Sequence, residues 1–295
     1  MDFGRMATAM VTPFDAHGRI DEYATKALIH HLIETGTTAL VVSGTTGESP
    51  TLSHEEKLTL FDIALKAADG RVPVVAGTGS NDTRSTAQLT REAAAVGVHA
   101  IMLVSPYYNR PSQDGLYTHF SEVASAVNLP VMLYNIPSRC GVNITPETLL
   151  RLAKIENIVA VKEASGDLSQ ILRIAASKPD DFALYSGDDK FTLPMLALGA
   201  TGVVSVASHV VGREMTMMMD AFWNGRHREA SDLAARLLPL FEVLFEEPNP
   251  APVKAALDLL GVASPSMRLP MIRPSAPLVQ RLNELLATFG YLTTA

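Results

Sequence analysis

The sequence predicts an α/β protein, a TIM (β/α)8 barrel with a C-terminal helical subdomain. Three observations predict it: eight short apolar or β-branched runs recur along the first two-thirds of the 295 residues, a segment with helical periodicity follows each run, and strand signals stop after the eighth. Continuously apolar strands indicate burial on both faces, and crossover helices join parallel strands. A doubly wound sheet and a closed barrel both fit, and the count of eight favours the barrel.

Turn and helix-end signals bracket the predicted strands. Ser53 followed by Glu56 forms a capping box, and Thr145 with Pro146 is typical of a helix N-terminus. Gly97 stands where a left-handed residue would close the preceding helix. The strands are therefore predicted at residues 6–11, 39–43, 72–76, 100–104, 131–134, 158–162, 183–186 and 202–206.

The chain divides into two predicted domains. Residues 1–224 form the catalytic barrel, and residues 225–295 form the helical subdomain packed on it, with helices near 225–246, 253–260 and 277–289. In such a barrel the chemistry belongs to the loops that follow the strands. A cluster of methionines has helical spacing, which favours a role in the core over an interface: Met215, Met217, Met218 and Met219.

Composition disfavours several functions. With 24 basic and 31 acidic residues the net charge is -7, and no stripe of Lys and Arg suits nucleic acid. No run reaches the roughly 20 apolar residues of a membrane helix, and the N-terminus lacks a signal-peptide pattern. Cys140 is the one cysteine, which fits a reducing compartment, and the histidines form no ligand pair that would suit zinc. We expect a soluble, cytoplasmic protein without a metal.

A lysine closes the sixth predicted strand. Lys162 follows four apolar residues, and burial disfavours its charged form. A neutral amine at the mouth of a barrel is a good nucleophile toward a carbonyl group. Taken alone, such a lysine more often reaches solvent or a carboxylate such as Glu163.

The fifth predicted strand favours a nucleophilic role for Lys162 over an ordinary surface role. It ends in Tyr134, and Arg139 follows five residues later. A buried phenol can pass protons to and from a carbinolamine, and a guanidinium suits a carboxylate. Singly, each residue is more often a packing residue or an ion-pair partner. Together with Lys162, they favour a site that forms a Schiff base.

Two loops add polar groups to the same rim. Residues 44–48 read Gly-Thr-Thr-Gly-Glu, and their amides with the hydroxyls of Thr45 and Thr46 suit a substrate carboxylate, although Gly and Thr are frequent in ordinary turns. After the fourth strand, Tyr107 and Tyr108 lie between prolines. This aromatic pair indicates either an interface or a site, or simple loop packing.

The order and spacing of these motifs resemble the dihydrodipicolinate synthase and N-acetylneuraminate lyase superfamily over nearly the whole chain. The motifs are GTTGES at 44–49, YYNRPS at 107–112, YNIPSR at 134–139, VKEASGD at 161–167, SGDD at 186–189 and EPNP at 247–250. The resemblance implies condensation of pyruvate with L-aspartate 4-semialdehyde to 4-hydroxy-tetrahydrodipicolinate, the first committed step of diaminopimelate and lysine biosynthesis. It implies no cofactor, since pyruvate itself is bound covalently.

The resemblance also implies a role for each motif residue. Lys162 condenses with the ketone of pyruvate, while Thr45, Tyr134 and Tyr108 form a proton relay. In the family that last tyrosine comes from the neighbouring subunit, so we expect a homotetramer built as a dimer of dimers. Further residues are implied to bind substrate: Thr46, Gly187 and Val204 hold pyruvate, and Arg139 binds the carboxylate of the aldehyde and of the cyclised product.

Three alternatives stay open. Sialic acid lyases usually show Gly-Ser-Thr at the first motif and no arginine at the position of Arg139, so an N-acetylneuraminate lyase is the second choice. A keto-deoxy sugar acid aldolase is the third. A ligand-sensing barrel is the non-enzyme alternative, and the presence of Lys162, Tyr134 and Thr45 argues against it.

Family members that lysine inhibits carry a further site at the subunit interface. Its residues are resembled here by Ser49, His54, Asn81 and Tyr107. Those members, however, have a histidine where this chain has Lys57 and a glutamate where it has Ser85. An added cation and a lost carboxylate weaken the binding of a cationic amino acid. The resemblance therefore predicts weak or absent feedback by lysine.

Overall fold

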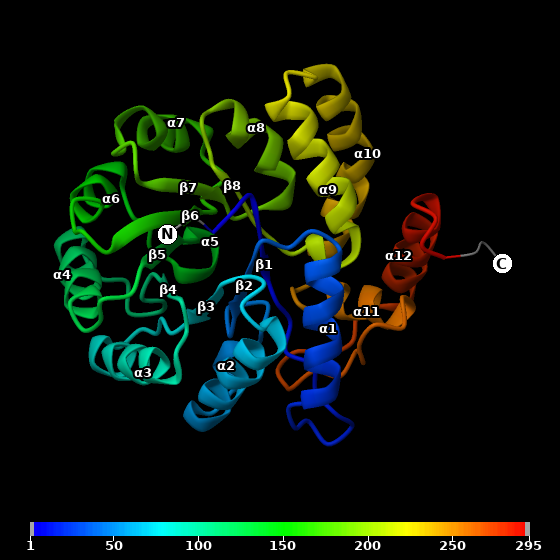
Figure 1. Cartoon of the computed structure of the whole chain (residues 1–295), viewed down its shortest axis with the longest axis horizontal. Helices are drawn as coiled ribbons and strands as arrows, with labels where there is room; N and C mark the ends of the chain where they lie inside the picture. Colours follow the sequence, from blue (N-terminus) through cyan, green and yellow to red (C-terminus); the bar gives the residue numbers. More distant parts are fainter. Residues whose placement is uncertain (1–2, 293–295) are drawn as a thin grey trace.

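The computed structural model describes residues 3–292, which form a closed barrel of eight parallel strands (Figure 1). The strands follow one another in chain order around the ring, and β1 pairs with β8 to close it. The predicted barrel is confirmed, with every strand within two residues of its predicted ends. The strands are β1 Met6–Ala9, β2 Ala39–Val42, β3 Val74–Gly77, β4 Ala100–Val104, β5 Val131–Asn135, β6 Ile158–Glu163, β7 Ala183–Ser186 and β8 Gly202–Ser205.

The largest differences in strand length have local causes. β1 ends before Val11, because the amide of Val11 donates to Nε2 of His209 at 3.1 Å. β3 begins after Pro73, which lacks the N–H that a strand would use. Both predicted runs were therefore too long by two residues at one end.

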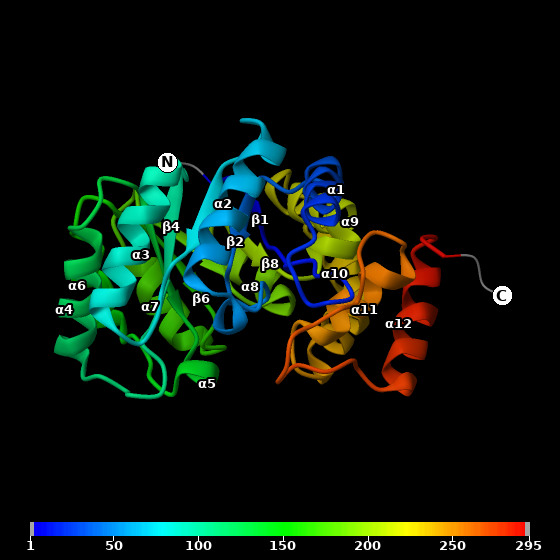
Figure 2. The same ribbon diagram turned by 90° about the horizontal axis from the view of Figure 1, so that it is seen from below.

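Helices surround the barrel on the outside, and the short helix α5 Pro137–Cys140 lies at one end of it (Figures 1 and 2). Every strand is followed by at least one helix, as the alternation predicts. The helices that follow strands are α1 Glu22–Glu34, η1 Ser49–Thr51, α2 His54–Ala68, α3 Thr83–Val96, α4 Gln113–Ala124, α5 Pro137–Cys140, α6 Pro146–Leu152, α7 Leu168–Ser177, η2 Asp189–Phe191, α8 Thr192–Ala197 and α9 Ser208–Trp223.

The predicted helix ends have the expected geometry. The side chain of Ser53 accepts from the amide of Glu56, whose carboxylate accepts from the amide of Ser53. Thr145 caps α6, and Gly97 ends α3 with a φ of 103°. These caps fix where each helix begins and ends, and so where the loops at the rim of the barrel lie.

Three helices follow α9: α10 His227–Glu246, α11 Ala251–Leu259 and α12 Ala276–Thr288. They group with α9 and α1 on one side of the barrel, away from α4 and α6 (Figures 1 and 2). Their predicted positions are confirmed to within two residues, while the division at residue 224 stays a prediction. The core interpretation holds for Met215, Met218 and Met219, which are buried, and is wrong for Met217, which is 55% exposed.

Successive side chains of each strand point to opposite faces of the sheet, so the buried hydrophobic residues form two clusters. The smaller cluster fills the barrel with mostly small residues from the strands, and the larger lies between strands and helices. Ala160 belongs to the inner cluster, so Lys162, two residues later on β6, also faces the interior, whereas Glu163 faces the helices.

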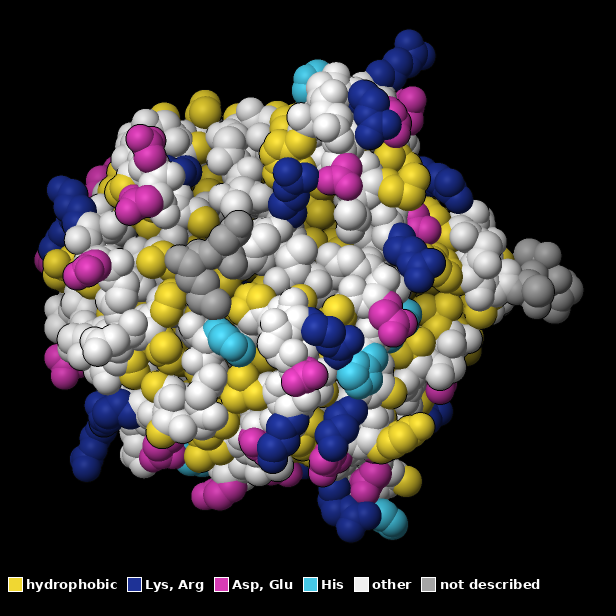
Figure 3. Space-filling model, viewed as in Figure 1, with side chains coloured by type: hydrophobic (Ala, Val, Ile, Leu, Met, Phe, Trp, Pro, Cys, Tyr) yellow, Lys and Arg dark blue, Asp and Glu magenta, His cyan; other side chains and the backbone are white. Residues whose placement is uncertain are grey.

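One face of the molecule carries a mixture of charges. On the face drawn in Figure 3, basic and acidic side chains are interspersed. Between residues 3 and 292, no helix has the length and apolar character needed to cross a membrane. Nor do described His, Cys, Asp and Glu side chains gather in threes that would suit a metal ion.

Candidate active site

The centre of the candidate site is the pair formed by Lys162 and Tyr134. They are register partners on β6 and β5, and Nζ of Lys162 lies 4.2 Å from the centroid of the phenol ring. The lysine is only 5% exposed, and it forms no ion pair or hydrogen bond within residues 3–292. The sequence-based placement of these two side chains on adjacent strand ends is confirmed.

Burial makes the lysine a weaker base than usual. It lowers the pKa of Lys162 to about 8, against the opposing effect of the Asp189 carboxylate; Arg139 lowers the pKa further and Asp188 raises it. With such a pKa, about a tenth of the amine is neutral at pH 7. A neutral amine is the form that attacks a carbonyl carbon.

Tyr134 is held in its protonated form. Burial raises the pKa of the phenol above its ordinary value, while Arg139 and the side chain of Thr45 act in the opposite direction. A phenol that stays protonated beside an amine can donate a proton to a developing alkoxide.

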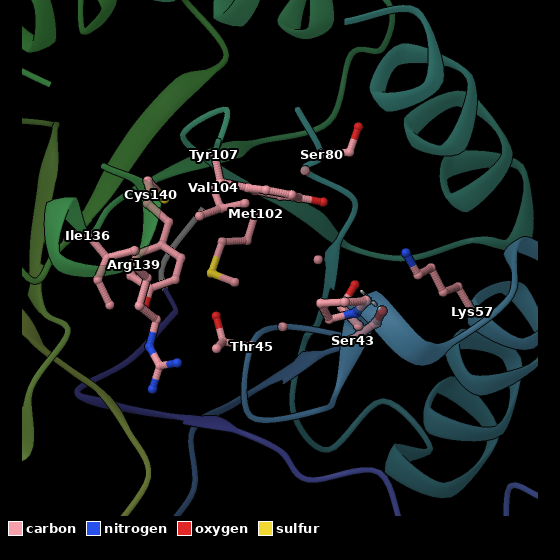
Figure 4. Close-up of a pocket in the computed structure, with 16 residues that line it drawn as sticks. Ser43, Thr45, Lys57, Ser80, Met102, Val104, Tyr107, Ile136, Arg139 and Cys140 are labelled. Carbon is pink, nitrogen blue, oxygen red and sulfur yellow. Dashed lines mark hydrogen bonds between the residues drawn. The ribbon is translucent and has the colours of Figure 1, made fainter. Parts of the chain in front are cut away.

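Tyr134 of this pair lines a cavity of about 210 Å³, and Lys162 is not among the lining residues (Figure 4). Thr45, Tyr134 and Arg139 line it, so the structure brings these three predicted residues together. Arg139 enters from α5, and Lys57 from α2 on the other side of the view. The volume suits a small organic acid, and the guanidinium makes no ion pair with a described residue.

The loop that carries the two threonines has an unusual backbone. Ser43 and Glu48, at its two ends, have φ values of 59° and 55°, in the left-handed region that residues with side chains rarely adopt. A Cβ on Gly47 would lie 3.1 Å from the carbonyl oxygen of Met10 and 3.2 Å from the amide nitrogen of Ser43. Thr12 donates to the Gly47 carbonyl at 2.7 Å. Such strain is found where the surrounding structure fixes a functional loop.

Of the remaining predicted pyruvate residues, Gly187 and Val204 lie close to this centre. A Cβ on Gly187 would come within 3.0 Å of Cγ of Lys162, so glycine leaves room for the lysine stem. Val204 belongs to the inner core of the barrel together with Tyr134. Thr46 is buried and does not line the cavity; its hydroxyl accepts a hydrogen bond from Asn249.

Several predicted residues lie apart from the cavity. Tyr108 is 89% exposed and does not line the cavity of its own chain. Among the residues predicted for lysine binding, Ser49 and Tyr107 line it together with Lys57. The other two have different partners: His54 pairs with Glu92, and the carbonyl of Asn81 accepts from the side chain of Asn109.

The family model described as "Dihydrodipicolinate synthetase family" matches residues 2–288. The chain belongs to this family. Two relatives, both named 4-hydroxy-tetrahydrodipicolinate synthase, come from Bacillus velezensis and Bacillus subtilis; they are 54% and 53% identical over 92% of this chain and 94% of their own length. The crystal structure of a dihydrodipicolinate synthase from Bacillus anthracis has a TM-score of 0.96 and 50% identity, and covers 98% of this chain and 99% of that one.

Asp189 is a site residue to which the sequence pattern assigned no role, although it lies in the SGDD motif at 186–189. It is 2% exposed, and its carboxylate accepts from Oγ of Ser205 at 2.5 Å and from the amides of Val206 and Ala207 at 3.1 and 2.9 Å. Burial raises the pKa of Asp189 to about 6. It thus anchors the end of β8 beside the lysine. The signal for it in the sequence was an acidic pair that follows β7 after one glycine.

A buried ion pair ties the threonine loop to the C-terminal helices. Nζ of Lys254 on α11 donates to Glu48 at 2.5 Å and to the Ser266 carbonyl at 2.7 Å. The side chains of Lys254 and Glu48 are each 1% exposed. The amide of Arg268 donates to the other oxygen of Glu48 at 3.0 Å. The signal in the sequence was a lone lysine in the apolar run 250–257.

Proposed function

We propose that this member of the family condenses pyruvate with L-aspartate 4-semialdehyde to 4-hydroxy-tetrahydrodipicolinate through a Schiff base on Lys162. The observation that carries the proposal is the buried amine of Lys162, which faces Tyr134 without an ion-pair partner among the described residues. The printed name of the relatives at 53–54% identity supports the same reaction. Activity as an N-acetylneuraminate lyase has no comparable support.

The first step joins pyruvate to the enzyme. Neutral Nζ of Lys162 attacks the ketone carbon, the carbonyl electron pair moves to oxygen, and a proton from Tyr134 converts that oxygen to the hydroxyl of a carbinolamine. The phenolate takes a proton from the attached nitrogen and passes it to the hydroxyl, which departs as water and leaves a protonated imine. Tyr134 is suited to this transfer, because burial keeps its phenol protonated next to the nucleophile.

The second step forms the carbon–carbon bond. The protonated imine withdraws electrons, so a methyl proton of pyruvate can leave and an enamine forms without any other electron sink. The enamine carbon attacks the aldehyde carbon, and a proton from the relay neutralises the alkoxide. The amino group of the bound substrate then displaces Lys162 from the imine carbon and closes the ring. Arg139, unpaired within residues 3–292, binds the substrate carboxylate.

The relay also calls for a second copy of the chain. Tyr108 has a φ of 75° and an exposed ring that lies off its own cavity, which suits insertion into a neighbour. We therefore include a homotetramer, built as a dimer of dimers, in the proposal. Sedimentation of the wild type gives the oligomeric state, and replacement of Tyr108 by Phe should lower turnover while leaving assembly intact.

Chemical trapping tests the central step. After incubation with pyruvate and borohydride, mass spectrometry should find one permanent adduct, located on the peptide that contains Lys162. Absence of the adduct, or an adduct on another lysine, would overturn the proposed chemistry. If the adduct forms but N-acetylneuraminate is processed faster than the semialdehyde, the aldehyde assignment is wrong and the Schiff base stands.

A further inference from the structure

One hydrogen bond brings the C-terminal part of the chain directly to a predicted pyruvate residue. Nδ2 of Asn249 donates to Oγ1 of Thr46 at 2.9 Å, and both side chains are buried. The two residues are 203 positions apart in the sequence. Asn249 lies just before α11, so the contact comes from the helices outside the barrel.

The amide of Asn249 is poorly suited to packing alone. Its Oδ1 is buried and accepts no hydrogen bond from residues 3–292. A buried acceptor without a partner costs stability, which an apolar side chain of similar size would avoid. The Nδ2 group makes the contact with Thr46, and Oδ1 is the atom left without a partner among the described residues.

The direction of this hydrogen bond determines what Thr46 can do. A hydroxyl group that accepts from an amide keeps its own proton for a different acceptor, and a carboxylate can only accept. We propose that Asn249 is a positioning residue, which fixes the Thr46 hydroxyl as a donor toward the carboxylate of pyruvate. This proposal rests on the proposed function, in which Thr46 helps to hold pyruvate.

Other contacts hold the remainder of the loop at residues 44–48 in place. Glu48 is held by Lys254 and by the amide of Arg268, and the carbonyl of Gly47 is held by Thr12. Loss of the Asn249 side chain therefore removes the partner of one hydroxyl and leaves the backbone anchors in place. This separation makes a specific effect on pyruvate measurable.

A double-mutant cycle tests the proposal. Asn249→Ala should lower kcat/KM for pyruvate by about tenfold, the scale of one hydrogen bond to a charged group, and change kcat/KM for the semialdehyde by less than about twofold. In a Thr46→Val background, the same replacement should have no further effect on pyruvate, because no hydroxyl remains to be oriented. In a Thr46→Ser background, the effect should return.

Controls separate positioning from a general structural role. Asn157 lies at the opposite end of β6, and its Nδ2 donates to the carbonyls of Ala124 and Val127; Asn157→Ala should leave kcat/KM for pyruvate unchanged. Equal losses for both substrates, or an undiminished loss in the Thr46→Val background, would overturn the proposal for Asn249. If the wild type yields no borohydride adduct on Lys162, the proposed function is wrong and this proposal fails with it. If the adduct forms but the effects of Asn249→Ala and Thr46→Val on kcat/KM for pyruvate are additive, this proposal alone is wrong.

Discussion

Two buried lysines of this protein have opposite surroundings. Lys254 on α11 donates to the carboxylate of Glu48, donates to a carbonyl and lies 4.5 Å from the ring of Phe14. Lys162 on β6 has neither an ion pair nor a hydrogen bond to residues 3–292 and faces a cavity-lining phenol. Burial lowers the pKa of both, but Glu48 opposes that effect directly at Lys254.

The difference separates a structural cation from a nucleophile. A buried charge persists when a carboxylate compensates it at hydrogen-bond distance, so Lys254 serves to hold the threonine loop. Without such compensation, the same side chain loses its proton near neutral pH and becomes reactive. Matched replacements at the two positions should therefore change different properties of the protein.

Lys162→Met should have the largest effect on activity. Turnover is expected to fall by roughly a thousandfold or more, because no other described amine faces Tyr134 and the covalent route is lost. Its free energy of unfolding should change little or increase, since methionine removes the cost of burying an amine. Steady-state turnover and urea unfolding of the same sample measure both. Substantial remaining turnover would contradict the role of Lys162.

Lys254→Met should affect stability instead. Removing one partner leaves the Glu48 carboxylate buried and uncompensated, which costs about 3–5 kcal/mol of unfolding free energy. Addition of Glu48→Gln should recover most of that loss, since no uncompensated charge then remains. Urea unfolding of the single and double variants provides the comparison. Equal stability of Lys254→Met and the wild type would mean that the ion pair does not hold the loop.

The carboxylate of Asp189 beside Lys162 should influence how kcat/KM for pyruvate depends on pH. As pH rises toward about 8, more of the amine is neutral, so kcat/KM for pyruvate should rise and then level off. The Asp189 carboxylate raises the pKa of Lys162, so Asp189→Asn should shift this rise to lower pH and increase the neutral fraction of the amine near pH 7.

The exposed carboxylate of Asp167 provides the control for that shift. It caps α7 and does not contribute to the pKa of Lys162, so Asp167→Asn should leave the profile in place. If Asp189→Asn moves the rise to higher pH, the electrostatic coupling assigned to Asp189 has the wrong sign.

The positions of the strands and of the Lys162–Tyr134 pair could be predicted from the sequence for one physical reason. In a parallel barrel all strands end at the same rim, so a polar residue at the end of an apolar run is placed by its local pattern. In the structure, the alternation of side chains along β6 places Lys162 inside the barrel and Glu163 outside it.

The contacts that support the site depend on chain folding over long distances. Nothing local indicates that Asn249 meets Thr46 or that Lys254 meets Glu48, since these pairs lie 203 and 206 residues apart. Likewise, the exposed ring of Tyr108 shows only that its own chain offers it no place in the cavity. Sequence periodicity thus predicts elements and their faces, whereas supporting contacts require the tertiary structure.

A third lysine gives the smallest expected effect. Lys57 lines the cavity beside Ser49 and Tyr107, has no ion-pair partner among residues 3–292, and has a pKa lowered by burial. Its amine repels a cationic ligand whenever it is protonated, so millimolar L-lysine should leave turnover nearly unchanged. The double variant Lys57→His with Ser85→Glu removes that cation and adds a carboxylate, so it should become measurably sensitive to L-lysine. Strong inhibition of the wild type would show that Lys57 does not exclude lysine, and the contrast among the three lysines would then be limited to Lys162 and Lys254.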